Sequence, residues 1–207
     1  MLISAENSQQ IARKIVKIEP RFKEVVSKFG PSPIGVRKSQ QSNFESLAES
    51  ILSQQLSTKA AGTIINRVSK MCAGRLNPAA ISSLRASKLR SAGCSESKAR
   101  ALIELARAVE GGELPIRSLN RKSDEEVMRI LVPYFGIGKW TVEMFLIFQL
   151  GRLDVWPTGD LGVRRGWEKV HRMKREVEVA QLEDLGAKFS PYRSHLAWYC
   201  WRAHSLY

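Results

Sequence analysis

Residues 133–150, PYFGIGKWTVEMFLIFQL, place two glycines directly before an apolar helical pattern. Glycine adopts positive φ readily and lets another backbone come close. A turn built on Gly136 and Gly138 at the start of a helix would therefore present backbone N–H groups at the positive end of the helix dipole, which suits a phosphate oxygen. Such contacts hold a nucleic acid without reading its bases. A plain helix–helix connection that ends on glycine is the alternative for these two residues alone.

A candidate catalytic carboxylate, Asp160, follows in the stretch DVWPTGDLGVRRGWEKV. Pro157 and Gly159 predict a rigid turn, and Asp160 stands where a helix should begin. Aspartate is common at this position for structural reasons alone, because its side chain caps the helix. The helix dipole and the backbone N–H groups also favour the charged form of such a carboxylate. A fixed anion of this kind suits the stabilisation of a developing cation better than general acid catalysis.

The charge balance points to a polyanionic partner. The chain of 207 residues has 33 Lys and Arg against 20 Asp and Glu, a formal charge of +13, and an ordinary apolar fraction of 43%. This composition predicts a folded protein of one large domain or two lobes. Nucleic acid is the first candidate partner and an anionic membrane surface the second. A basic protein without such a partner is the remaining interpretation.

Metal sites and membrane segments have little support in the sequence. The cysteines form no CxxC pair, so neither zinc nor an iron–sulfur cluster is expected, and the histidines are too scattered for a catalytic triad or a metal site. These residues are Cys72, Cys94, Cys200, His171, His195 and His204. The N-terminus lacks the pattern of a signal peptide, and no apolar run has the length of a membrane span. We expect a soluble intracellular protein with reduced cysteines, no metal, no cofactor and no membrane partner.

Most segments follow a helical period, and strand patterns are scarce. The apolar positions of FESLAESILSQQL recur at the spacing of one buried helical face, and Ser95 is a plausible N-cap further on. Ser123 and Glu126 predict a capping box for a helix that runs toward Pro133. Ser190–Pro191 predicts an N-cap followed by proline at the first position of a last helix, in which Trp198 and Trp201 are interpreted as core residues. The expected fold is all-α with about eight to ten short helices, and residues 31–38 are irregular.

Several ordered motifs resemble one family. The stretches PYFGIGKWTVEMFLIF and DVWPTGDLGV resemble the helix-hairpin-helix DNA glycosylase superfamily, in particular the 3-methyladenine DNA glycosylase II branch of alkylation repair. The segments FESLAESILSQQLSTKAAGTI, LRSAGCSESKARALIELARAV and FSPYRSHLAWYCWRAH are similar to its early, middle and closing helices. The resemblance implies a two-lobed all-α fold with the active site in a cleft. One lobe would span about 42–145, with the hairpin at 133–140, and the other 1–41 plus 146–207.

The resemblance also implies a reaction and a partner. The partner would be duplex DNA with a damaged base, which is flipped out of the stack and hydrolysed from its sugar by a monomeric enzyme. Asp160 matches the family's catalytic aspartate, which stabilises the sugar cation and orients or deprotonates the attacking water. Phosphate contacts would come from the hairpin, namely Gly136, Ile137, Gly138, Lys139 and Thr141. Gln55 matches the residue that fills the vacated space, with Leu56 as the neighbouring candidate.

Trp140 distinguishes the branches of the family. Strand-cleaving relatives carry a lysine at this position, which forms a Schiff base with the sugar. Trp140 instead implies hydrolysis and a stacking contact with an electron-poor base. Phe189, Met144 and Leu161 match further positions of the base pocket, although Met144 and Leu161 replace aromatic residues of a well-known bacterial member.

Two alternatives stay open beside hydrolysis of alkylated purines. A glycosylase with lyase activity would use Lys139, and a non-enzymatic module would bind damaged DNA through the hairpin. Phe135 departs from the family, which has proline directly before the first hairpin glycine. The preferred lesion is left open, as is the compartment, either a prokaryotic cytoplasm or a nucleus.

Overall fold

The computed structural model describes residues 3–37 and 39–206, and all regular structure in these residues is helical. The prediction of an all-α chain is therefore confirmed, although the helices outnumber the expectation. The elements are α1 Ala5–Ile18, η1 Pro20–Phe22, α2 Lys23–Phe29, α3 Asn43–Ser53, α4 Thr58–Met71, α5 Pro78–Ser83, α6 Ala86–Ser91, α7 Glu96–Glu110, η2 Ile116–Arg121, α8 Asp124–Leu131, α9 Lys139–Met144, η3 Phe145–Gln149, α10 Leu161–His171, α11 Val179–Ala187 and α12 Arg193–Leu206. None of the described helices combines the length and the apolar character needed to cross a bilayer.

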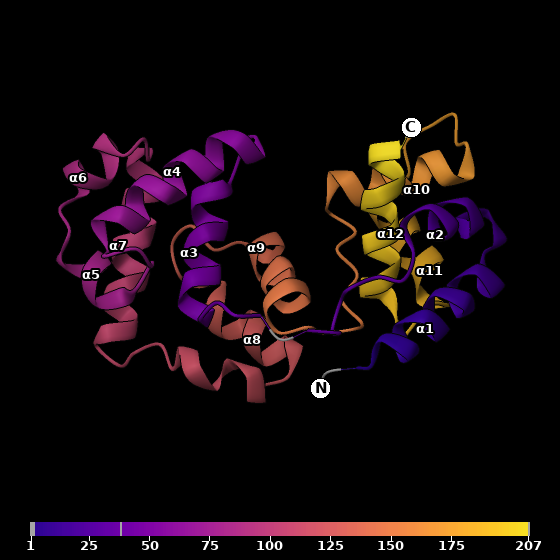
Figure 1. The fold of residues 1–207 in the computed structure, drawn as a ribbon, viewed down its shortest axis with the longest axis horizontal. Helices are drawn as coiled ribbons and strands as arrows, with labels where there is room; N and C mark the ends of the chain where they lie inside the picture. The colour runs from indigo at the N-terminus through magenta and orange to yellow at the C-terminus, as the bar shows by residue number, and fades with distance from the viewer. Residues whose placement is uncertain (1–2, 38, 207) are drawn as a thin grey trace. The chain divides into compact units, whose positions relative to one another are not determined.

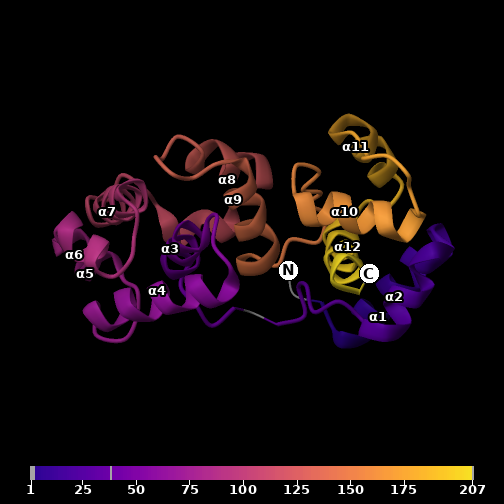
Figure 2. The ribbon, with the colours of Figure 1, turned by 90° about the horizontal axis from the view of Figure 1, so that it is seen from above.

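Contacts within the chain define two compact units. One is Gln40–Phe145, and the other joins Met1–Ser39 to Leu146–Tyr207. In the first unit α3 is the central helix and packs against α4, α7 and α9 (Figures 1 and 2). The apolar face of α3 is buried, as its sequence period predicts; its members are Phe44, Leu47, Ala48, Ile51 and Leu52.

Side-chain caps fix the ends of several helices in the first unit. Ser95 accepts the backbone N–H of Lys98 at the start of α7. Ser123 and Glu126 form the predicted capping box of α8, each side chain pairing with the other's backbone N–H. These bonds satisfy N–H groups that have no partner within the helix. Both sequence predictions are confirmed.

In the second unit α12 packs closely against α10 and also contacts α1 and α2 (Figures 1 and 2). The approach of α10 to α12 depends on Gly166, where an added Cβ would overlap the carbonyl oxygen of Cys200. Trp198 is buried in this unit, as expected of a core residue. The close crossing brings the N-terminal end of α10 beside the side chain of Trp201.

The start of α12 differs from the prediction. The helix begins at Arg193, and Ser190 donates its hydroxyl to Asp154 Oδ2 at 2.8 Å instead of capping the helix. Asp154 Oδ1 accepts the backbone N–H of Arg193 at 3.2 Å, so a carboxylate distant in sequence serves this helix end. The Arg193 guanidinium also contacts both oxygens of Asp154. Burial alone would raise the pKa of Asp154, but hydrogen bonds from Arg193 and Ser190 outweigh it and hold that pKa below its usual value.

Candidate active site

The glycine hairpin lies between α8 and α9 and is pressed onto α7. Gly136 has φ +81°, and a Cβ there would lie 2.6 Å from Cβ of Ala101. Both the left-handed backbone and the close approach require glycine. Gly138 is the N-cap of α9, yet a Cβ added there would meet nothing within 4 Å. The absence of a side chain at Gly138 is therefore not explained by packing within the protein, and it leaves the backbone accessible.

Phe135, which stands where the family has proline, packs against an arginine. The guanidinium carbon of Arg100 lies 4.2 Å from the centroid of the Phe135 ring, and its Nε is 2.7 Å from Glu104 Oε1. A guanidinium over an aromatic face is a favourable cation–π contact. Phe135 thus gives the hairpin a second attachment to α7, beside the contact of Gly136 with Ala101.

The side chains of the hairpin candidates differ in exposure. Ile137 is buried, and Thr141 is only 2% exposed and accepts a hydrogen bond from Gln54 at 3.3 Å. Neither side chain is at the surface, so a phosphate contact at these two positions would come from the backbone, and their place in the DNA-binding hairpin stays a prediction. Lys139 is exposed, and its Nζ lies 3.6 Å from Glu143 Oε1.

Trp140 and Met144 are one turn apart on α9 and therefore share a helix face. Trp140 is 43% exposed and Met144 is half-buried. An indole that is accessible at the start of a helix can stack on an aromatic ligand. These two positions keep their predicted place as base-contacting candidates within this unit.

The predicted wedge turn joins α3 to α4. Gln55 is exposed and has φ +56°, and Leu56 is 39% exposed. A residue other than glycine seldom adopts this left-handed conformation, and such residues are frequent at ligand-binding sites. The turn therefore exposes both wedge candidates, and the backbone is strained at Gln55.

Asp160 is fixed in the second unit by two hydrogen bonds to one oxygen. As N-cap of α10, it accepts the backbone N–H of Val163 at Oδ1, 2.8 Å away. The same Oδ1 accepts Nε1–H of Trp201, also at 2.8 Å. Two donors on one oxygen define the plane of the carboxylate. The thiol of Cys200 is nearby, and burial followed by the negative charge of Asp160 raises its pKa.

The surroundings of Asp160 include aromatic residues that the sequence did not identify. Trp201 is half-buried rather than part of the core, which corrects its interpretation from the sequence. Phe148, in the π-helical turn η3, is 52% exposed and lies with its ring centroid 5.4 Å from that of Trp201. Leu161, directly after Asp160, is exposed, and its role in the base pocket stays a prediction.

Phe189 does not have the environment predicted for it. Its side chain is 1% exposed and packs edge-on against Trp167 in the interior of the second unit. No face of the ring is available for a base, so the structure assigns Phe189 to core packing. An aromatic residue in a motif is as easily buried as exposed, and only tertiary packing distinguishes the two cases.

No group of three or more His, Cys, Asp or Glu side chains in the described ranges could hold a metal ion. All three cysteines are buried and free. His171 stacks on Trp167, at 4.1 Å between centroids, and its Nε2 lies 3.4 Å from Glu19. The hydrogen bonds of Asp160 described above come from a backbone N–H group and an indole N–H.

A helical fold with a Gly-Ile-Gly hairpin and a capping aspartate before α10 defines a class of DNA repair protein. Residues 48–191 match the HhH-GPD superfamily of base excision DNA repair proteins, and the chain belongs to this superfamily. The all-α helix-hairpin-helix glycosylase fold is thereby confirmed, and the active-site cleft that the resemblance implies stays a prediction.

Similar proteins carry the names of 3-methyladenine DNA glycosylases or glycosidases. DNA-3-methyladenine glycosylase 1 of Schizosaccharomyces pombe is 31% identical over 100% of this chain and 95% of its own length. The solved structure of the 3-methyladenine DNA glycosylase of that yeast, in complex with abasic DNA, matches with a TM-score of 0.85 over 93% of this chain and 95% of the other. A DNA-3-methyladenine glycosidase from Bacillus halodurans, 32% identical, matches with a TM-score of 0.80 over 94% of this chain and 88% of the other.

Proposed function

We propose that this chain is a monofunctional DNA glycosylase that hydrolyses the N-glycosidic bond of alkylated purines in duplex DNA and leaves an abasic site. The observation that carries the proposal is the carboxylate of Asp160, which Val163 N–H and Trp201 Nε1–H hold through one oxygen. The relatives named as 3-methyladenine DNA glycosylases support the substrate class.

Asp160 acts on the sugar. As the bond from C1′ to the purine breaks, its electron pair leaves with the base and positive charge develops on the sugar ring. A preorganised carboxylate stabilises this charge. Water then adds its oxygen to C1′, and its proton passes to the carboxylate or to solvent. An alkylated purine already carries positive charge and leaves as a neutral base, so one carboxylate suffices where an O-glycosidase uses two.

Trp140 acts on the base. Its half-exposed indole can stack on a cationic purine, a contact of about 2 kcal/mol when water is excluded. Met144 lies on the same face of α9 and offers a polarisable apolar contact. This pair favours charged, electron-poor bases over normal ones.

Lys139 is a poor candidate for lyase chemistry. A Schiff base requires an unprotonated amine close to C1′, whereas Lys139 is exposed and lies 3.6 Å from the buried carboxylate of Glu143. Lys139 also stands one residue before the position of the family's lyase lysine, which Trp140 occupies. Hydrolysis without strand cleavage is therefore the proposed outcome.

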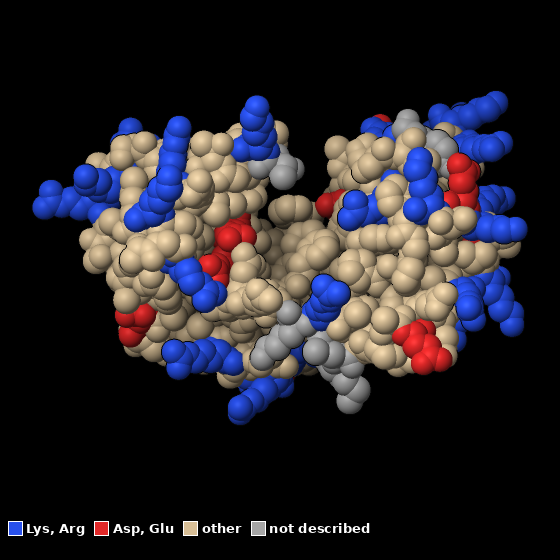
Figure 3. Space-filling model, in the orientation of Figure 1, with Lys and Arg blue, Asp and Glu red and all other residues tan. Residues whose placement is uncertain are grey.

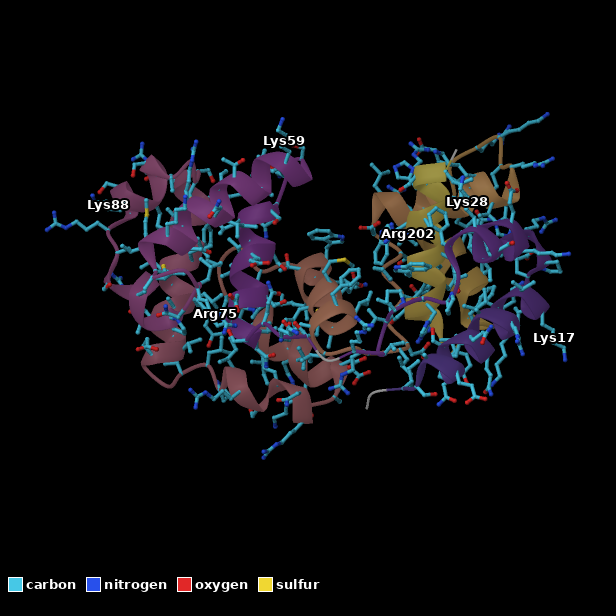
Figure 4. The ribbon with its side chains drawn as sticks, in the orientation of Figure 1. Lys17, Lys28, Lys59, Arg75, Lys88 and Arg202 are labelled. Carbon is cyan, nitrogen blue, oxygen red and sulfur yellow. The ribbon has the colours of Figure 1, made fainter. Side chains whose placement is uncertain are left out.

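DNA binding is proposed to rest on phosphates and on the wedge turn. Lysine and arginine side chains are distributed over the face of each unit shown in Figure 3, where acidic ones are fewer. Lys59 projects from the start of α4, directly after the turn of Gln55 and Leu56 (Figure 4). The relative from S. pombe was solved with abasic DNA, the product expected of this reaction.

Base release from a panel of duplexes tests the proposal. The duplexes carry 3-methyladenine, 7-methylguanine, hypoxanthine, ethenoadenine or no lesion, and the products are analysed before and after alkaline cleavage of abasic sites. We expect release of methylated purines, strand breaks only after alkali, and no covalent adduct with borohydride. A borohydride adduct that disappears in Lys139→Ala would instead establish the lyase. Release of no base from any duplex would leave a DNA-binding module.

A further inference from the structure

Lys98 fastens the turn that carries Gln55. It lies near the start of α7, and its Nζ donates hydrogen bonds to the carbonyl oxygens of Leu52 at 2.8 Å and Gln54 at 2.7 Å. Both carbonyls belong to the C-terminal end of α3, where helical carbonyls lack partners within the helix. An ammonium group there also matches the negative end of the helix dipole. The residue before Gln55 is therefore held by a cation from another helix.

Gln54 fastens the same turn to the glycine hairpin. Its Nε2 donates to the carbonyl oxygen of Gly136 at 2.8 Å and contacts Thr141 Oγ1 at 3.3 Å. Thr141 is buried in α9, and Gly136 is pressed onto Ala101 of α7, so both acceptors are themselves fixed. The amide of Gln54 thus bridges two loops that are far apart in the sequence.

These contacts surround a strained residue. Gln55 adopts φ +56° without being glycine. A conformation of this kind persists only where neighbouring contacts determine it. Lys98 holds the carbonyl directly before Gln55, and Gln54 anchors the preceding side chain. Together they restrain the backbone from which the Gln55 side chain projects.

We propose that Lys98 and Gln54 are positioning residues for base flipping. They hold the wedge turn and the hairpin as one rigid body, so that the side chain replacing the flipped base and the backbone gripping a phosphate act in register on neighbouring nucleotides. The proposal rests on the proposed function, because it takes Gln55 as the wedge. A turn that has to be ordered during insertion would lose part of its binding free energy to that ordering.

Three variants and one control test this proposal. Gln54→Met and Lys98→Met remove the donors but keep the length of the side chains, and Lys98→Arg retains the charge and the donors. Lys88→Met is the matched control, because Lys88 is exposed and projects outward from α6 (Figure 4). Thermal unfolding identifies the variants that are folded, and if Lys98→Met is not among them, Gln54→Met decides.

Flipping is measured with 2-aminopurine beside the lesion, and base release is measured in single turnover with the lesion that wild type releases fastest. We expect the rate of flipping and the rate of base release to fall by about 10- to 100-fold in the two Met variants. A small misplacement of a positioning group has effects of this size. The Kd for undamaged duplex should stay within about twofold, since phosphate contacts dominate such binding. Lys98→Arg should recover most of the activity, and Lys88→Met should match wild type.

A lesion placed opposite an abasic site separates positioning from general damage to the fold. This lesion has no partner base to break from, so flipping requires less work by the wedge. We expect the Met variants to approach the wild-type rate on this substrate. An equal loss on paired and unpaired lesions, or no loss on paired ones, would overturn the inference while leaving the glycosylase activity of wild type intact. Absence of base release by wild type would instead reject the proposed function.

Discussion

Trp201 Nε1 donates a hydrogen bond of 2.8 Å to Oδ1 of Asp160, the same oxygen that caps α10 through the N–H of Val163. The indole comes from α12, and Gly162 and Gly166 of α10 provide the space for it and for the α12 backbone. The carboxylate is thus oriented by one contact from its own helix and one from another. A hydrogen bond to a charged group contributes more than one between neutral groups.

Replacing Trp201 by phenylalanine tests this orientation. The substitution removes the donor but keeps an aromatic ring beside Phe148. Loss of a hydrogen bond to a charged group costs about 1.5–3 kcal/mol, so single-turnover base release should fall by about 10- to 100-fold. The affinity for undamaged DNA should not change. A wild-type rate in Trp201→Phe would show that the hydrogen bond from Trp201 is not needed to orient Asp160.

The two hairpin glycines should separate stability from DNA binding. Gly136→Ala combines a strained φ with a contact of 2.6 Å to Ala101, and we expect it to lower the free energy of unfolding by about 1–3 kcal/mol. Gly138→Ala introduces a methyl group into open space and should leave stability within about 0.5 kcal/mol of wild type.

Urea unfolding and DNA titration measure the two effects. If a phosphate approaches the backbone at Gly138, Gly138→Ala weakens binding of every duplex regardless of sequence. Unchanged DNA affinity in this variant would argue against the hairpin as the phosphate contact. Equal stability of Gly136→Ala and wild type would contradict the tight packing on α7.

Buried His195 predicts a loss of stability in acid. Its side chain is fully buried, neither ring nitrogen has a hydrogen-bond partner among the described residues, and burial lowers its pKa to about 4. The unfolded chain, with a pKa near 6.5, binds a proton that the folded chain does not. The free energy of unfolding should therefore decrease as the pH falls from about 6.5 to 4, with a slope of at most about 1.4 kcal/mol per pH unit.

The difference in stability between His195→Leu and wild type isolates this contribution from the carboxylates, whose titration is common to both proteins. We expect the free energy of unfolding of His195→Leu to rise relative to that of wild type as the pH is lowered from about 6.5 to 4. His204→Gln serves as the control, because His204 is exposed. A difference that does not vary with pH would mean that His195 is protonated to the same extent in both states.

Phosphate contacts predict a steep salt dependence. The chain carries a formal charge of +13, and each phosphate neutralised by a lysine or arginine contributes about −0.9 to the slope of log K against log salt concentration. We expect a slope steeper than about −3 for undamaged duplex. Fluorescence anisotropy at increasing potassium chloride concentrations measures it. A slope near zero would indicate that binding does not depend on the phosphates.

Local sequence signals predicted the helices well. The apolar face of α3 and the capping box of Ser123 and Glu126 are each set by residues within one or two turns, so the pattern alone identifies them. The same holds for Asp160, whose turn and capping role depend on adjacent residues. The hairpin was identified from its glycines and from the helices that flank it.

Contacts between segments that are distant in sequence could not be predicted from local sequence patterns. The start of α12 is fixed by Asp154, which accepts hydrogen bonds from the Ser190 hydroxyl and from the backbone N–H of Arg193. Asp154 lies far from both residues in sequence. Trp201 was interpreted as a core residue because a tryptophan in a terminal helix is more often buried than ligand-stacking. Only the crossing of α10 and α12 reveals its hydrogen bond to Asp160. The glycines at positions 162 and 166, one turn apart, were a usable signal of a close helix partner.

Single-turnover base release by wild type and Asp160→Asn, on a duplex that carries one methylated purine, tests the central claim most directly. Asp184→Asn is the matched control, because Asp184 is an exposed carboxylate on α11. Removing the negative charge that stabilises the sugar cation should slow release by at least about 100-fold, with unchanged DNA affinity and a folded protein. The control should release base at the wild-type rate. Release by Asp160→Asn at the wild-type rate would contradict the assignment of Asp160 as the catalytic carboxylate.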